Sequence, residues 1–185
     1  MANVKHSTAQ SSFLEGSVCR SFIADEDIDN GVLISKGDLE DGEREIYKAE
    51  FDVTKPAYLA LDVAWVYDDY KYERINDESV YTNKACKPFR AYQLKPDHRY
   101  KVSTNITADK LEIGDFVIIG ENGKIKKATS ETNAANAFVG KVIAIDKYGF
   151  TYAVGTVGGV DTGTSMYEIE VVKNEPVAAS KPSGT

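Results

Sequence analysis

The side chains most able to do chemistry in this chain are the carboxylates of DEDIDNG, Asp25 to Gly31. Three aspartates at alternate positions have the spacing of the first, third and fifth ligands of an EF-hand calcium loop. Such a loop needs glycine at its sixth position and glutamate at its twelfth, where Asn30 and Lys36 stand. The stretch therefore predicts an acidic turn, and we predict no metal site.

Two further patterns could indicate catalysis. Asp97, His98 and Ser103 have no partner that orients a base against a nucleophile, and the chain has no G-x-S-x-G elbow. The glycine-rich stretch GTVGGVDTGTS, residues 155–165, precedes a strand pattern, whereas a phosphate loop requires a helix behind it. We therefore predict a protein that is not an enzyme and that has no cofactor.

Composition narrows the class of protein further. The 185 residues, 42% of them hydrophobic, are enough for a compact domain with its own core, and the mean hydropathy is -0.35. The net charge of -7 argues against a nucleic-acid partner, because such surfaces are normally basic. No apolar run long enough for a membrane span is present, and no signal peptide is recognised, so we expect a cytoplasmic origin. Cys19 and Cys86 lie outside any CxxC spacing and are expected to be reduced, partly buried thiols.

Short apolar or alternating stretches separated by turn residues predict a mainly β fold. We expect an N-terminal arm over 1–16, a β-rich region over 17–97, a small antiparallel β-barrel or sandwich over 98–173, and a tail over 174–185. Asn122-Gly123 is typical of a hairpin turn in which both residues have positive φ. A second hairpin is expected between residues 139–146 and 150–157.

The segment 67–97 differs from its surroundings and is expected to be a long excursion with one short strand. It is rich in tyrosine, which favours a loop that packs on a partner over a disordered one. Its basic part, 84–101, has six basic residues and one acidic residue, whereas 25–52 has eleven acidic and three basic residues. Either these segments meet complementary surfaces or they are solvated faces. The candidate binding residues, for a partner or for self-association, are Phe13, Leu14, Trp65, Tyr67, Tyr70, Tyr72, Tyr81, Phe89, Arg90 and Tyr92.

The stretch LEIGDFVIIGENGKIKKATSETNAANAFVGKVIAI, residues 111–145, has a characteristic order: Gly-Asp, an apolar strand, a turn, a strand ending in Lys-Ala, and Phe-Val-Gly before another strand. It resembles the small β-barrel unit of the capsid decoration, or cement, proteins of tailed bacteriophages. The resemblance implies a structural protein that is made in the host cytoplasm and lies on the capsid surface of the virion. It would bridge major capsid proteins, and a homo-oligomer is left open.

One alternative belongs to a different class. The aromatic residues from Trp65 to Tyr81 could line a sugar-binding face, because aromatic rings stack on the apolar faces of sugars. The chain would then be a carbohydrate-binding or host-attachment module. The same aromatic residues are more typical of a hydrophobic anchor at a protein interface, where Tyr and Trp are enriched.

Overall fold

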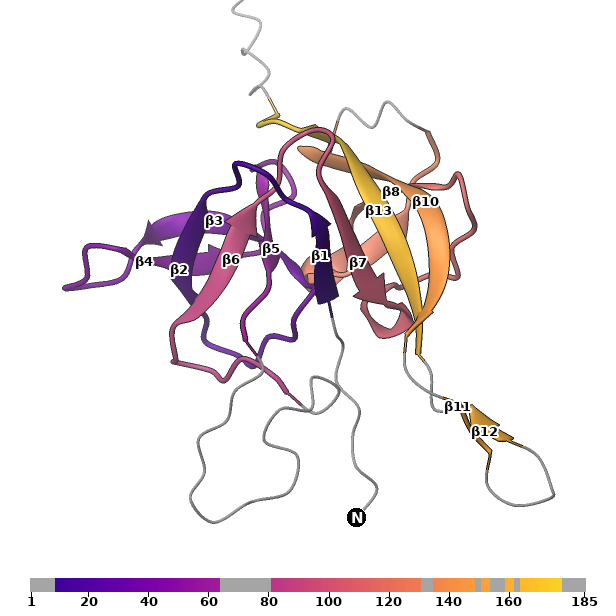
Figure 1. The fold of residues 1–185 in the computed structure, drawn as a ribbon. Helices are drawn as coiled ribbons and strands as arrows, with labels where there is room; N and C mark the ends of the chain where they lie inside the picture. The colour runs from indigo at the N-terminus through magenta and orange to yellow at the C-terminus, as the bar shows by residue number, and fades with distance from the viewer. Residues whose placement is uncertain are drawn as a thin grey trace, which may run out of the picture.

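The structure is a computed structural model that describes residues 9–63, 81–130, 135–148, 151–153, 159–161 and 164–177. Within these ranges the regular secondary structure consists of strands, apart from two short 3-10 turns, η2 (Thr104–Ile106) and η3 (Glu121–Gly123). The predicted mainly β fold is therefore confirmed. The strands form two bodies that stand side by side, a closed barrel and a six-stranded sheet (Figure 1).

The barrel is formed by strands from the N-terminal half. In spatial order they are β2 (Cys19–Ile23), β4 (Ile46–Glu50), β3 (Leu33–Leu39), β5 (Ala57–Ala60) and β6 (Phe89–Gln93). The ring closes because β2 pairs in parallel with β4 and antiparallel with β6. Aromatic rings fill its interior, and the Phe22 ring centroid lies 5.2 Å from that of Tyr58 and 6.3 Å from that of Phe89.

The closed barrel lies in the N-terminal half, whereas a small barrel or sandwich was predicted over 98–173, where the strands form a six-stranded sheet. The cause is β6, which lies within the segment 67–97 that was expected to be mostly loop. With β6 assigned to a loop, the N-terminal half lacks the strand that closes the ring. Because closure removes both exposed strand edges, the N-terminal half needs β6 to form its barrel.

Strands of the C-terminal half and β1 form a six-stranded sheet, whose edge strand is bridged at Ile125 to Thr107, shortly after the second strand of the sheet. Its order is β1 (Ala9–Phe13), β7 (Arg99–Ser103), β13 (Thr164–Asn174), β10 (Phe138–Tyr148), β8 (Phe116–Ile119) and β9 (Ile125–Lys127). The predicted hairpin between residues 139–146 and 150–157 is wrong. β10 pairs along its length with β13, from Phe138 opposite Asn174 to Tyr148 opposite Thr164, whereas β11 (Thr151–Ala153) pairs with β12 (Gly159–Asp161). The long ladder outcompetes the short local one because it offers more paired positions.

The Asn122-Gly123 turn joins β8 to β9 and also contacts the barrel. Both residues have positive φ, 52° and 69°, as the sequence predicts. A Cβ atom at Gly123 would stand 2.2 Å from the carbonyl oxygen of Leu33 and 2.7 Å from a methyl carbon of Val32. The glycine therefore serves two needs, the turn's backbone conformation and its close approach to β3.

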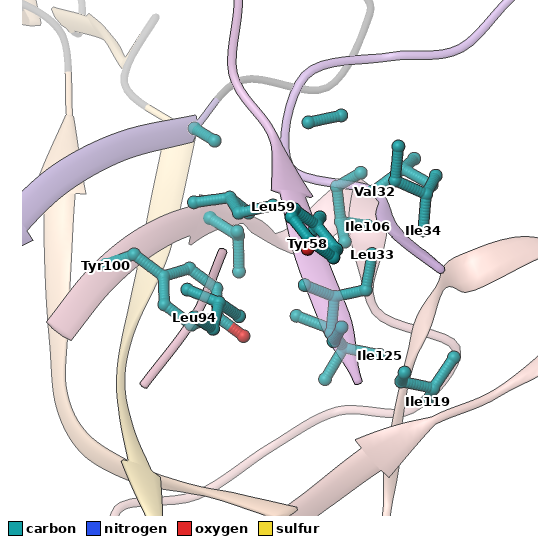
Figure 2. Close-up of a cluster of buried hydrophobic side chains, with 14 of the residues drawn as sticks. Val32, Leu33, Ile34, Tyr58, Leu59, Leu94, Tyr100, Ile106, Ile119 and Ile125 are labelled. Atoms are coloured by element: carbon teal, nitrogen blue, oxygen red, sulfur yellow. The ribbon is translucent and has the colours of Figure 1, made fainter. Parts of the chain in front are cut away.

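A single hydrophobic core runs through both bodies. Figure 2 shows barrel residues such as Leu33 and Leu59 in one cluster with Tyr100, Ile119 and Ile125 of the sheet. The buried side chain of Asn174 adds polar contacts across the same junction. Its Nδ2 donates to the carbonyl oxygens of Ala57 and Leu94, at 2.9 and 2.8 Å, and its Oδ1 accepts from the N–H of Ala57 at 2.7 Å.

Two predicted segments are more ordered than expected where the structure describes them. In the arm over 1–16, residues 9–13 form β1, which pairs antiparallel with β7. In the excursion over 67–97, Thr82 and Asn83 are buried and residues 89–93 form the closing strand of the barrel. The remaining parts of these predictions, residues 1–8 and 67–80, lie outside the described residues.

Candidate interaction surface

Two buried asparagines fix the chain at both ends of residues 64–80. Asn30 donates from Nδ2 to the carbonyl of Asp62 at 2.8 Å, and its Oδ1 accepts from the N–H of Asp62 at 3.0 Å. Asn83 donates from Nδ2 to Asn30 Oδ1 at 3.1 Å and to the carbonyl of Ile28 at 2.9 Å. Because buried polar networks with satisfied partners are rigid, both ends are held against the same acidic turn.

Three of the predicted binding residues lie in the neighbourhood of Asp62, which contacts the backbone of one of them. The N–H of Arg90 donates to Asp62 Oδ2 at 3.3 Å, and the hydroxyl of Tyr81 donates to Asn83 Oδ1 at 3.2 Å. Burial raises the pKa of both Tyr81 and Tyr92, and the negative charge of Asp62 adds to each increase. For Tyr92, the Cys19 thiol on the neighbouring strand raises the pKa further. We call Cys19, Asp62, Tyr81, Arg90 and Tyr92 the Asp62 surface.

The alternation of β6 decides which of its side chains a partner can reach. Phe89 and Ala91 point into the barrel and are buried, whereas Arg90 is exposed and Tyr92 is half-buried. Phe89 is only 3% exposed and packs against Phe22, so its prediction as an interface residue is corrected. The period of two along a strand gives the physical reason: residues 89 and 90 face opposite sides.

Phe13 and Leu14 lie elsewhere, at the end of β1. Phe13 is 49% exposed and meets the ring of His98 edge to face, with centroids 6.5 Å apart, whereas Leu14 packs partly against the core. The His98 Nδ1 accepts from the N–H of Lys95 at 3.2 Å, which leaves Nε2 to donate to the carbonyl of Glu15 at 2.9 Å. Phe13 therefore offers an exposed apolar contact, and it packs on the ring of His98, which two hydrogen bonds hold in place. Trp65, Tyr67, Tyr70 and Tyr72 lie outside the described residues.

Internal pairing reduces the contrast between the acidic and basic segments. Lys84 Nζ lies 2.7 Å from Asp27 Oδ2, so the two segments meet within one chain. Arg99 pairs with Glu170 at 2.6 Å and Lys101 pairs with Asp146 at 2.6 Å. Three of the six basic residues of 84–101 are therefore already partnered. Such exposed pairs add little to stability, but they lower the charge that a partner would meet.

Two further features bear on reactivity, the cysteine thiols and the side chains that could bind a metal ion. Cys19 and Cys86 are free thiols, and both are exposed rather than partly buried as predicted. Over the part of the chain that the structure describes, no three His, Cys, Asp or Glu side chains come together in a way that could hold a metal ion. In the same part, no helix has the length and apolar character needed to cross a membrane.

A cavity of about 450 Å³ opens where the barrel meets the sheet. Its walls are the acidic turn, the η2 turn and the η3 turn, so it draws on segments far apart in the sequence. Sequence patterns predicted the acidic turn and the Asn122-Gly123 turn, but nothing local to either indicates that they face one cavity. The lining residues are Glu26, Asp27, Ile28, Asp29, Val32, Phe51, Thr82, Asn105, Ile106, Asn122 and Lys124.

Comparisons with known proteins give no family assignment. A scan against protein-family models finds no match, and a search of curated proteins finds none either. Among solved structures, the chain is similar to the head fiber gp8.5 N base of bacteriophage phi29, with 10% identity and a TM-score of 0.42. The alignment covers 88% of this chain and 99% of that chain. A likeness at this level carries no argument about function.

Proposed function

We propose that this protein is a non-enzymatic structural component of a tailed-phage virion that decorates the capsid surface and bridges major capsid proteins. The observation that carries the proposal is the Asp62 surface, where Arg90 and Tyr92 alternate along β6 beside the exposed thiol of Cys19, with Tyr81 nearby. Tyr, Trp and Arg supply most of the binding energy at protein interfaces. The sequence adds four more aromatic residues between the two fixed ends of this surface: Trp65, Tyr67, Tyr70 and Tyr72.

The rigidity of the body supports the same proposal. The Asp62 surface is carried by barrel strands and by the asparagine network, so its side chains need little ordering on binding. Phe13 offers a second contact point on the sheet, and two contact points on one rigid body suit a protein that spans neighbouring subunits. Many weak contacts repeated over a lattice gain strength through avidity.

Cosedimentation with capsids tests the proposal. Wild-type protein should pellet with empty capsids of the phage that encodes it, and each of Tyr81→Ala, Arg90→Ala and Tyr92→Ala should lower occupancy. A hot-spot residue contributes about 1–2 kcal/mol or more, so affinity should fall by roughly tenfold per substitution. Arg44→Ala is the matched control, because Arg44 is equally exposed but lies on the β3–β4 loop.

The possible outcomes distinguish whether the protein binds capsids at all from whether it binds them through the Asp62 surface. Capsids that never bind the wild-type protein would exclude decoration and leave the carbohydrate-binding module as the better account. Normal binding by all three variants would exclude the Asp62 surface, and a triple variant with Phe13, Tyr70 and Tyr72 changed to Ala would then test three of the remaining candidates. Circular dichroism of each variant checks that the fold is retained. Sedimentation of the protein alone reports whether it forms a homo-oligomer.

Salt dependence gives an independent measure of the contact chemistry. Since Lys84, Arg99 and Lys101 are paired within the chain, we expect capsid binding to depend mainly on aromatic and apolar contacts. Occupancy should therefore change little as salt rises past about 0.15 M, where the Debye length is about 8 Å. A steep loss of occupancy over this range would show that the charged segments dominate.

A further inference from the structure

We infer that the cavity between the barrel and the sheet is a binding site for a neutral saccharide. Its volume of about 450 Å³ lies within the range of roughly 300–1,000 Å³ that is usual for small-molecule sites. Such sites commonly occur where two structural units meet. The inference does not depend on capsid binding, since the cavity residues are different from those of the Asp62 surface.

The lining combines an apolar floor with a polar rim. Ile28, Val32 and Ile106 are buried, and the half-buried ring of Phe51 stands beside them. The exposed rim carries the carboxylate of Glu26, the amide of Asn105 and further polar groups on Asn122 and Lys124. An apolar floor suits the C–H face of a sugar ring, and a rim with both donors and acceptors suits its hydroxyl groups.

The balance of charge selects the class of ligand. Glu26, Asp27 and Asp29 would repel a phosphorylated or acidic ligand. A cationic ligand would meet the ammonium group of Lys124 in the rim, and the carboxylate of Asp27 is already paired with Lys84, which lies outside the lining, at 2.7 Å. With Asp27 paired, the carboxylates of Glu26 and Asp29 face the ammonium group of Lys124, so neither an anion nor a cation gains much by entering. A neutral ligand with many hydroxyl groups uses the same polar atoms without this opposition.

The cavity is preformed because each wall is fixed independently. The acidic turn is held by paired backbone hydrogen bonds between Ile28 and Asn83, both 2.9 Å. The η3 turn is seated against β3 by the close approach of Gly123 to Leu33. The η2 turn is closed by the hydroxyl of Thr107, which donates to the carbonyl of Thr104 at 2.8 Å. Ligand binding therefore needs little reorganisation.

Methyl NMR titration tests the site directly. The ¹H–¹³C signals of Val32 and Ile106 should shift on addition of neutral mono- and disaccharides of glucose, galactose, mannose or N-acetylglucosamine in the millimolar range. Glu26→Ala and Asn105→Ala should each weaken binding by about tenfold, the effect of losing one good hydrogen bond. Asn105→Trp should abolish binding by filling the mouth. Glu43→Ala, an exposed glutamate on the β3–β4 loop, is the matched control and should bind normally.

Three results would overturn the inference. Absence of any shift with the whole saccharide panel would exclude a saccharide site. Undiminished shifts in Asn105→Trp would place the binding elsewhere on the protein. Shifts produced only by short lysine- or arginine-containing peptides would make the cavity a site for cations. Because Glu26 and Asn105 are exposed, their variants should keep the wild-type melting temperature, which separates loss of binding from loss of fold.

Discussion

Replacing Asn174 with alanine should weaken the junction between the sheet and the barrel. Asn174 is the last residue of β13, and its buried amide makes three hydrogen bonds to the barrel side, with lengths from 2.7 to 2.9 Å. Two of these go to Ala57 at the start of β5 and one goes to Leu94 just after β6. The amide therefore connects the end of the sheet to two different places on the barrel.

The expected loss can be worked from these three bonds. Each hydrogen bond of this kind contributes a net of about 1 kcal/mol, and buried groups left without a partner cost about 1–3 kcal/mol each. The carbonyl of Ala57 keeps a second donor, the N–H of Leu94 at 3.3 Å, which limits the penalty there. The free energy of unfolding should therefore fall by about 3 kcal/mol, a large share of the roughly 5–15 kcal/mol typical of a domain.

Urea unfolding followed by far-UV circular dichroism measures this loss. Asn105→Ala is the control, because Asn105 is exposed on η2 and its removal should change stability by less than about 0.5 kcal/mol. Asn174→Asp keeps an acceptor for the N–H of Ala57 but turns a carboxylate toward two carbonyl oxygens, so it should be no more stable than the alanine variant. An Asn174→Ala loss no greater than that of Asn105→Ala would refute the reasoning.

Three further substitutions test separate parts of the structure. Gly123→Ala adds a Cβ atom 2.2 Å from a backbone carbonyl oxygen of β3. Its melting temperature should therefore fall well below that of Gly114→Ala, because Gly114 also has positive φ but has open space around it. Equal melting temperatures of the two variants would contradict the close approach. Tyr100→Phe removes a buried hydroxyl without a hydrogen-bond partner in the described structure, so the free energy of unfolding should stay constant or rise by about 1 kcal/mol; a clear loss in urea would contradict this. A hydrogen bond from Lys127 lowers the pKa of Asp115 below its ordinary 3.8. The ionised carboxylate therefore stabilises the fold above pH 3.8, and this stability is lost as pH falls through the lowered pKa. Asp115→Asn should flatten the fall in melting temperature below about pH 4, and an unchanged dependence on acid pH would exclude this role.

Local features of the fold were predictable because their causes lie in neighbouring residues. β8 occupies 116–119, the apolar run that the sequence indicates, and the Asn-Gly pair adopts positive φ at both positions. Strand partners were not predictable in the same way. β10 has eleven residues and pairs with β13, which lies beyond the intervening β11 and β12, because non-local ladder length decides the pairing. A pattern of alternation identifies a strand but does not identify its neighbour.

The candidate surface shows the same division. Tyr81, Arg90 and Tyr92 were predicted from residue type, but the carboxylate of Asp62 in their neighbourhood was not. Phe89 was predicted at the surface from residue type as well, but the alternation of β6 turns it inward. The sequence indicated the role of Asn30 only indirectly: it stands where an EF-hand loop requires glycine, which excluded a calcium loop but did not show that Asn30 anchors Asp62.

The order of the strands along the chain bears on how firmly the barrel and the sheet are joined. β1 belongs to the sheet, the next five strands form the barrel, and β7 returns to the sheet, so the barrel is an insertion between two neighbouring sheet strands. The two chain segments that connect the sheet to the barrel are hydrogen-bonded to each other. Ser17 Oγ donates to the carbonyl of Gln93 at 2.7 Å, and His98 contacts the carbonyl of Glu15 at 2.9 Å. A force applied to the barrel reaches the sheet through both connecting segments, through the shared core and through Asn174. The two bodies should therefore unfold in one transition, and a surface on the barrel keeps a fixed position relative to a contact such as Phe13 on the sheet.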